Sequence, residues 1–234
     1  MTIPFIDIHT HKTPSSECGN GDNAGTYIRI INKDFSDEIN DNHNLLYSIG
    51  VHPWNSINIV NDDQFINSCI STIKEKLTCQ RIVFIGESGL DILRGADISL
   101  QRKLFIKQIH LSESTYRPLI IHCVKAFNDL IEIHKSTGAK QPWILHGYRN
   151  KNEQAKQLIQ NGIELSFGPR FNEASMQVAW QERKMWLETD DSSSTIEEVY
   201  EKASECLGVS VDEIKKDIYE RAIILLKGND LFQK

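Results

Sequence analysis

Eight short apolar segments alternate with seven longer segments of helical periodicity, and this order predicts an α/β fold of the (β/α)8 TIM-barrel class. Apolar residues in the short segments are consecutive rather than alternating, as in parallel strands buried on both faces. Strands are expected at 5–11, 26–31, 45–52, 81–91, 118–124, 142–148, 163–169 and 185–191. An open doubly wound sheet is the alternative architecture, but the sequence contains no glycine-rich dinucleotide turn.

The helical segments follow the strands in the second half of the chain. They are expected at 62–77, 99–114, 125–136, 152–160, 172–183, 195–207 and 211–226. The first half is less regular, because residues 12–25 have loop composition and the connector 32–44 is short for a full crossover. We therefore expect a single domain over residues 1–234 whose barrel is distorted or trimmed in its first crossovers.

Composition excludes several classes of protein. No apolar run approaches the ~20 residues of a membrane helix, and the N-terminus does not resemble a secretory signal, so a cytoplasmic protein without membrane contact is expected. The net charge of −6 argues against stable binding to duplex nucleic acid, which requires a basic surface. Five cysteines without C-x-x-C spacing argue against a disulfide framework or a structural zinc site.

Metal-capable side chains stand near the carboxyl ends of five predicted strands, where barrel enzymes place their active sites. They are His9, His11, Glu87, His122, His146 and Asp190. His9 and His11 are two residues apart, so on a strand they share one face. Separate structural roles would leave several buried polar groups without partners, which is costly, so a shared site is the better interpretation.

Six nitrogen and oxygen ligands exceed the needs of one tetrahedral zinc ion and suit two cations about 3.5–4 Å apart. Glu87, in the middle of the strand order, is expected to bridge the two ions. Asp190 is expected to bind one ion and to accept a proton from the bridging water, so both acids are candidate catalytic residues. Four imidazoles favour zinc or manganese, with magnesium possible at high concentration. The resulting pocket is electropositive and suits an anionic phosphate ester, although a neutral ester or amide also fits.

Five segments resemble the TatD-family metal-dependent hydrolases, within the amidohydrolase-like barrels. They are FIDIHTH from Phe5, GVHPW from Gly50, FIGESGLD from Phe84, PLIIHC from Pro118 and LETD from Leu187, with LHGY from Leu145 as a weaker sixth. Each motif is short, but their ordered combination is highly specific.

The resemblance implies a binuclear-metal phosphodiesterase, usually described as a 3′→5′ deoxyribonuclease acting on DNA or RNA ends. By motif match, one metal would be held by His9, His11 and Asp190, and the other by His122 and His146, with Glu87 between them. His52 of GVHP would line the pocket. A small or nucleic-acid-end phosphodiester substrate is implied, and the chain is expected to be a monomer or a small homo-oligomer.

The sequence departs from the family pattern at substrate contacts rather than at metal ligands. Val124 stands where the family has Arg, and Lys125 follows it. After LETD, Asp191 and Ser192 replace the family's Ala-Pro. After LH, Gly147 and Tyr148 replace an aromatic residue and Gly.

Four basic residues lie just beyond predicted strand ends. Lys125 and Arg170 are candidate phosphate contacts, whereas Lys12 and Arg149 are more typical of solvated loop charges.

Other residues are assigned structural roles. Asp91 is expected to orient the GESGLD turn, and Cys123 to pack away from the ligands. His43, His110 and His134 have no matching partners. Two other functions remain open: an amidohydrolase, lactonase or deacylase acting on a carboxyl ester or amide in the same binuclear site, and a non-catalytic, metal-stabilised binding protein.

Overall fold

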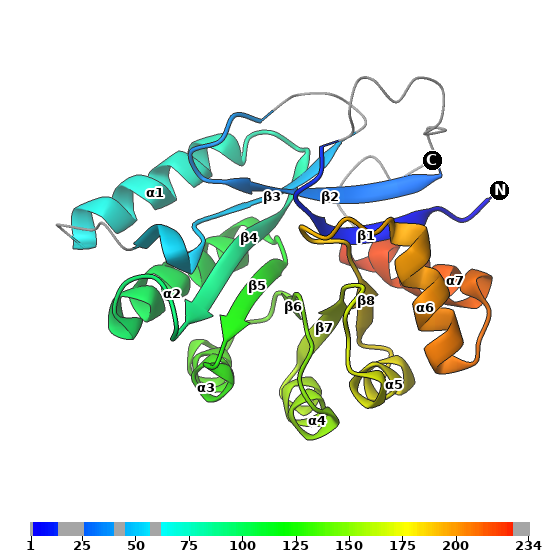
Figure 1. Cartoon of the computed structure of the whole chain (residues 1–234). Helices are drawn as coiled ribbons and strands as arrows, with labels where there is room; N and C mark the ends of the chain where they lie inside the picture. The colour runs from blue at the N-terminus through cyan, green and yellow to red at the C-terminus, as the bar shows by residue number, and fades with distance from the viewer. Residues whose placement is uncertain (1, 14–25, 40–44, 57–61, 227–234) are drawn as a thin grey trace.

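The computed structural model describes residues 2–13, 26–39, 45–56 and 62–226. Its eight strands form one parallel sheet in the order β1 to β8, curved into a nearly closed barrel (Figure 1). The strands are β1 (Phe5–Thr10), β2 (Tyr27–Asp34), β3 (Leu46–Gly50), β4 (Ile82–Asp91), β5 (Leu119–Val124), β6 (Trp143–Leu145), β7 (Ile163–Phe167) and β8 (Met185–Leu187).

The helices lie outside this sheet. They are α1 (Asp62–Lys76), α2 (Ile98–Thr115), α3 (Phe127–Thr137), α4 (Asn152–Gln160), α5 (Glu173–Gln181), α6 (Ile196–Leu207) and α7 (Val211–Leu225), and a 3₁₀ turn, η1 (Pro53–Ser56), follows β3. Local sequence explains several of the helix starts: α6, for example, begins at a capping box in which Thr195 and Glu198 satisfy each other's backbone N–H groups.

The predicted barrel is confirmed, and the doubly wound alternative is wrong, because strand neighbours follow sequence order without a reversal. Each observed strand overlaps a predicted segment. The second prediction, 26–31, stopped short of the end of β2 at Asp34. The last three residues of β2 are Asn32, Lys33 and Asp34, whose polarity is typical of a connector, yet all three pair with β3.

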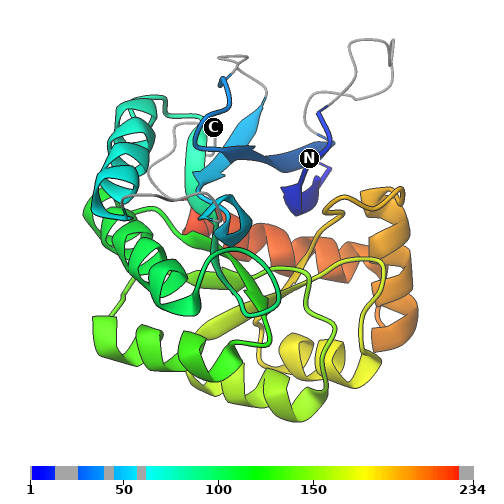
Figure 2. The same cartoon turned by 60° about the vertical axis from the view of Figure 1, so that its left-hand side comes forward.

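The first crossovers are trimmed, as expected. Within the described parts of the chain, no helix lies between β1 and β2 or between β2 and β3, and the helical layer starts only after β3 with α1. The last two helices, α6 and α7, both contact β1; they are drawn in orange and red in Figure 2. None of the described helices is long and apolar enough to cross a membrane.

Between β1 and β8 the barrel closes through a short seam rather than a full ladder. Thr10 and Asp190 form an isolated parallel bridge. The His11 N–H donates to the Asp190 carbonyl at 3.2 Å, and the Asp190 N–H donates to the His9 carbonyl at 3.0 Å. Buried Asp7 accepts hydrogen bonds from the Thr189 N–H at 2.9 Å and from the Thr189 hydroxyl at 2.7 Å. The seam therefore brings the first and last ligand-bearing segments together.

The barrel core is formed by the consecutive apolar residues that predicted the strands. All ten residues of β4 are buried, and so are the large side chains of Trp143 and Trp186. Among the described cysteines, Cys69, Cys79, Cys123 and Cys206 are free thiols.

Two of the three histidines assigned structural roles are described. His110 is exposed on α2, and His134 packs edge-on against Trp143. His43 lies outside the described residues.

Candidate metal centre

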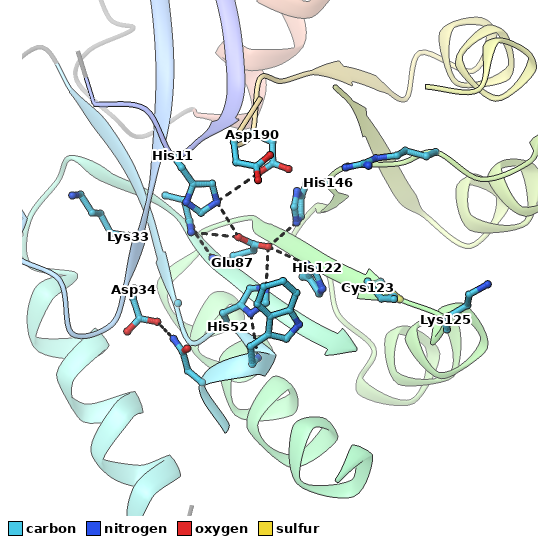
Figure 3. A pocket seen from close by; sticks show the side chains of 18 of the residues that line it. His11, Lys33, Asp34, His52, Glu87, His122, Cys123, Lys125, His146 and Asp190 are labelled. Atoms are coloured by element: carbon cyan, nitrogen blue, oxygen red, sulfur yellow. Dashed lines mark hydrogen bonds and ion pairs between the residues drawn. The ribbon is translucent and has the colours of Figure 1, made fainter. Parts of the chain in front are cut away.

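All six residues predicted to bind metal converge at the carboxyl-terminal mouth of the barrel, around the carboxylate of Glu87 (Figure 3). They come from β1, β4, β5 and the segments that follow β1, β6 and β8. Groups of these side chains place one ligand atom each within 4.8 Å of one another. The convergence expected from the strand ends is therefore present.

One group surrounds the Oε2 atom of Glu87. His9 Nε2 lies 3.6 Å and His11 Nε2 lies 3.5 Å from this oxygen, and both nitrogens lie 3.6 Å from Asp190 Oδ1. Neighbouring ligands around a tetrahedral ion with bonds of about 2.1 Å are about 3.4 Å apart. The four atoms thus have the spacing of a first cation position.

A second group surrounds the other carboxylate oxygen, Oε1. His146 Nε2 lies 2.7 Å, His122 Nδ1 3.1 Å and His52 Nε2 3.2 Å from this atom. Glu87 therefore presents one oxygen to each of two sets of imidazoles, which is the geometry that a bridging carboxylate requires.

The hydrogen bonds of His52 separate it from the other imidazoles. Its Nδ1 accepts the Trp54 N–H at 3.1 Å, and its carbonyl accepts the Asn55 N–H at 3.0 Å. With Nδ1 accepting, the neutral ring carries its proton on Nε2, so His52 donates to Glu87 rather than offering a lone pair. His52 thus both supports its loop and lines the pocket.

Two buried carboxylates face the outer nitrogens of the second group. Asp91 Oδ2 lies 3.3 Å from His122 Nε2, and Glu188 Oε1 lies 3.6 Å from His146 Nδ1. A carboxylate on the outer nitrogen directs the lone pair of the inner nitrogen toward a cation. Asp91 also accepts the Leu93 N–H at 2.8 Å, so it orients its turn as predicted.

Sequence reasoning missed Glu188, although a signal for it was present. Glu188 and Asp190 are two residues apart, the same spacing that placed His9 and His11 on one face. Glu188 is fully buried and accepts the Gly147 N–H at 2.7 Å, which fixes its position beside His146.

Asn32 is a second residue that the sequence did not reveal. Its Oδ1 accepts the Glu87 N–H and the Ser48 hydroxyl, both at 2.9 Å, and its Nδ2 donates to Glu87 Oε2 at 3.4 Å. The register of β2 on β3 pairs Asn32 with Ser48, but no local pattern shows that Glu87 lies within reach. Only the packing of β2, β3 and β4 brings these side chains together.

The neighbouring imidazoles control the charge of Glu87. Burial by itself raises its pKa, but His146, His11 and His122 outweigh burial and hold the pKa well below its usual range. Asp190 behaves in the same way: burial is outweighed mainly by His9, which lowers its pKa to about 2. Both carboxylates are therefore ionised at neutral pH and available as ligands.

The pKa values of His52 and His146 are shifted in opposite directions. Burial lowers the pKa of His52, in accord with a neutral ring. Burial also opposes protonation of His146, but Glu87 and Glu188 hold its pKa well above the usual value. A cation bound beside Glu87 would compete with this proton, so loading the site would release protons.

The donor set fits divalent cations. Both ring nitrogens of buried His9 lack a hydrogen-bond partner. The same holds for His146, whose 2.7 Å approach to Glu87 is not directed as a hydrogen bond. Buried polar atoms normally have hydrogen-bond partners. Buried ring nitrogens that face carboxylates without such a partner are therefore the arrangement expected of metal ligands.

Close packing of β4 against β5 helps to set the geometry. A Cβ atom on Gly86 would lie 2.3 Å from the Ile120 carbonyl, and one on Gly89 would lie 2.0 Å from the His122 carbonyl. Only glycine permits this approach, which places His122 beside Glu87.

A cavity of about 930 Å³ opens over the cluster, and the predicted phosphate contacts Lys125 and Arg170 line it together with His52. Arg149, interpreted from the sequence as a solvated loop charge, is exposed and also lines the cavity. The Lys12 ammonium instead donates to the Ser194 carbonyl at 2.6 Å. Cys123 packs partly against the core at the cavity edge and belongs to none of the ligand groups among the described residues.

Comparison with known proteins agrees with this arrangement. A family model described as TatD related DNase matches residues 6–227. An uncharacterized metal-dependent hydrolase of Buchnera aphidicola is 34% identical over 131 residues, covering 55% of this chain and 47% of that protein. One from Bacillus subtilis is 31% identical over 134 residues, covering 56% and 50%. The chain thus matches about half the length of these curated relatives.

Solved structures share the fold over a larger part of the chain. The crystal structure of YJJV, a TatD homologue from Escherichia coli K12, has a TM-score of 0.74 at 18% identity and covers 97% of this chain and 99% of that one. A hydrolase TatD family protein from Entamoeba histolytica has a TM-score of 0.72 at 17% identity, covering 97% and 99%.

Proposed function

The chain belongs to the TatD related DNase family of metal-dependent hydrolases, and from this premise we propose that it is a two-metal phosphodiesterase that acts on nucleic acid ends. The observation that carries the proposal is Glu87, whose two carboxylate oxygens face two separate sets of imidazoles. His9, His11 and Asp190 would hold one cation, His122 and His146 the other, and Glu87 would bridge them.

Two divalent cations held in this way would acidify a water molecule and offset the charge that develops on the phosphoryl oxygens. The imidazole-rich set favours zinc or manganese, while magnesium, which prefers oxygen ligands, would support activity at high concentration. We also propose that residues 1–234 act as one hydrolase domain in the cytoplasm, as a monomer or small homo-oligomer.

The chain's own side chains would perform the remaining chemistry. Asp190 is ionised at neutral pH because its pKa is about 2, and it would accept a proton from the attacking water. Once Glu87 binds cations through its oxygens, the Nε2–H of His52, which otherwise donates to Glu87 Oε1, would be free to donate to a non-bridging phosphate oxygen. Lys125 and Arg170, at the cavity rim, would orient the phosphate through charge-assisted hydrogen bonds.

Hydrolysis of a single-stranded oligonucleotide tests the proposal, with protein loaded with zinc, manganese or magnesium. Glu87→Ala and His122→Ala should each lower kcat by at least about 100-fold while leaving the circular dichroism spectrum unchanged. Wild-type activity in either variant would contradict the proposed site.

A carboxyl-ester or amide hydrolase using the same two cations is the second candidate. Val124 favours it, because the family resemblance leads us to expect Arg at this position, and without that Arg the site would offer one phosphate contact fewer. A panel of phosphodiester, lactone, ester and amide substrates separates the two functions. Turnover of only the carboxyl compounds would replace the phosphodiesterase proposal, and hydrolysis of none by metal-loaded protein would favour a metal-stabilised binding protein.

A further inference from the structure

The cavity above the metal cluster has two differently charged sides. Its basic side consists of Lys125, Arg149 and Arg170 from the loops after β5, β6 and β7, and Asp190 and Asp191 after β8 also line the cavity. Its acidic side consists of Asp34 and Asp37, with Lys33 beside them in the lining, while Lys76, outside the lining, donates to the Asp37 carbonyl. Lys33 and Asp34 lie on one flank of Glu87 and Lys125 on the opposite flank (Figure 3).

The cations of the basic side are available to a ligand. Lys125, Arg149 and Arg170 are exposed, and none forms an ion pair with another described residue. The backbone of Lys125 adopts a φ of +59°, a conformation that side-chain-bearing residues rarely occupy. Such positions cluster at functional sites, and this one follows β5 directly instead of capping a helix.

The carboxylates of the acidic side are fixed in place. Asp34 accepts hydrogen bonds from the Ser36 N–H at 3.2 Å and from the Asn55 amide. Asp37 accepts the Asp34 N–H at 2.9 Å. These bonds hold two negative charges at the rim, where they would repel a phosphate.

Trp54 adds an aromatic ring to the same side. The residue is 40% exposed and lines the cavity, and its Nε1 donates a 2.6 Å hydrogen bond to Asp91. The Arg94 guanidinium, which is not part of the cavity lining, lies over the ring at 4.6 Å from its centre and covers one face. An aromatic ring of this kind stacks on a nucleobase and does not require a phosphate. The acidic side is therefore suited to an uncharged nucleoside.

From this asymmetry we infer that the site distinguishes the two ends of its substrate by their phosphorylation. The inference rests on the proposed phosphodiesterase function. A phosphate next to the scissile one lies against Lys125, Arg149 and Arg170, and the nucleoside on the opposite side of the scissile bond carries a free hydroxyl. Hydrolysis adds water across one P–O bond, so one fragment leaves with a hydroxyl and the other with a phosphate.

The basic side accommodates about one additional phosphate. Arg149 and Arg170 also line an adjoining groove that continues to Lys202, but Glu173 and Glu205 line that groove as well. In the cavity above the metal cluster, Lys125, Arg149 and Arg170 outnumber Asp191, and a dinucleotide with one terminal phosphate should already use the available contacts.

Three thymidine dinucleotides test the inference: TpT, pTpT with a 5′-phosphate and TpTp with a 3′-phosphate. We expect one phosphorylated dinucleotide to have a kcat/KM about tenfold above that of TpT, from one added charge-assisted contact. The other should fall below TpT. If both end phosphates raise kcat/KM, both lower it, or neither changes it, the inference is wrong.

Variants assign the effect to the two sides. Arg149→Ala should reduce the preference for the favoured end phosphate relative to TpT by about tenfold. Asp34→Asn combined with Asp37→Asn should relax discrimination against the other end phosphate. Lys12→Ala, which removes a cation bonded to the Ser194 carbonyl, is the matched control and should keep both ratios. If Arg149→Ala and the Asp34→Asn, Asp37→Asn double variant both keep the wild-type ratios, as Lys12→Ala should, the assignment of the effect to the two sides is wrong.

Binding measurements test the end-phosphate preference even if the protein hydrolyses no phosphodiester. If metal-loaded protein hydrolyses none of the dinucleotides, the phosphodiesterase proposal fails. Equilibrium dialysis of the same three compounds against wild-type protein then measures the asymmetry directly. Tightest binding of one phosphorylated dinucleotide and weakest binding of the other would support it, and any other order would contradict it.

Discussion

Asn32 shows how one uncharged side chain can control a metal centre. Its amide group contacts both the backbone N–H and the carboxylate of Glu87, and the Ser48 hydroxyl holds it from behind. Since Glu87 would bridge the two proposed cation positions, a residue that restricts its rotamer would prepare both positions together. Asn32 is therefore a positioning residue that need not touch the substrate.

Asn32→Ala should weaken binding of zinc or manganese by at least about tenfold, because Glu87 loses its orienting partner. Calorimetric titration of metal-free protein measures this without relying on activity. Ser48→Ala, which removes only the support of Asn32, is the graded control and should have a smaller effect. Wild-type metal affinity in Asn32→Ala would show that Glu87 is positioned by the histidines alone.

His134 allows a second test at the residue scale, away from the metal cluster. Burial against Trp143 lowers its pKa below the usual 6.5. As pH falls, the unfolded chain takes up this proton first, so stability present above about pH 6.5 is lost toward lower pH. His134→Gln should reduce the loss between pH 7.5 and 5.5 by a few tenths of a kcal/mol, since the ring is half-exposed.

Urea denaturation at the two pH values measures the His134 effect, and His110→Gln on the exposed surface of α2 is the matched comparison. An unchanged pH dependence in His134→Gln would show that burial of this ring does not contribute to acid sensitivity.

At the scale of elements, the seam between β1 and β8 brings together the residues of the proposed first cation position. His9 and Asp190 lie on the two sides of that seam, about 180 residues apart in sequence. The Thr189 hydroxyl links the sides, because it donates to Asp7 and lies 2.8 Å from the Thr10 hydroxyl. These few contacts thus take the place of a continuous hydrogen-bonded ladder between β1 and β8.

Thr189→Val preserves side-chain shape but removes the hydroxyl, leaving buried Asp7 with one donor fewer. The free energy of unfolding should fall by about 1–3 kcal/mol, as for other buried groups that lose a partner. Thermal denaturation should show a midpoint lower by several degrees, about 2–4 °C per kcal/mol. Thr189→Ser retains the hydroxyl and should remain closer to wild type; a wild-type midpoint in Thr189→Val would contradict the role of the hydroxyl.

At the scale of the whole molecule, the cluster unites strands from opposite parts of the barrel, so a bound cation stabilises the fold as well as the site. Its ligands extend from His9 to Asp190 in a chain whose barrel is only nearly closed. Anything that binds the folded state alone raises stability in proportion to RT ln(1 + [L]/Kd).

Chelator treatment should therefore lower the melting temperature. Zinc at about 1,000 times its Kd contributes about 4 kcal/mol, or about 10 °C for a protein of this size. Differential scanning calorimetry with and without chelator measures the shift, and elemental analysis identifies the metal. Asp190→Ala combined with His122→Ala should lose most of the shift, and a wild-type protein insensitive to chelator would contradict the centre.

The sequence by itself predicted the barrel and the six residues that the structure brings together in the candidate metal centre. Consecutive apolar residues reveal strands locally, and the parallel arrangement then places the residues near each carboxyl end, such as His9, Glu87 and His146, at one mouth. The tertiary structure decided the rest: Asn32 beside Glu87, the tautomer of His52, Glu188 behind His146 and the charge asymmetry of the cavity. These features depend on distances between side chains on different strands and loops, which no local periodicity encodes, because they arise only when the barrel closes.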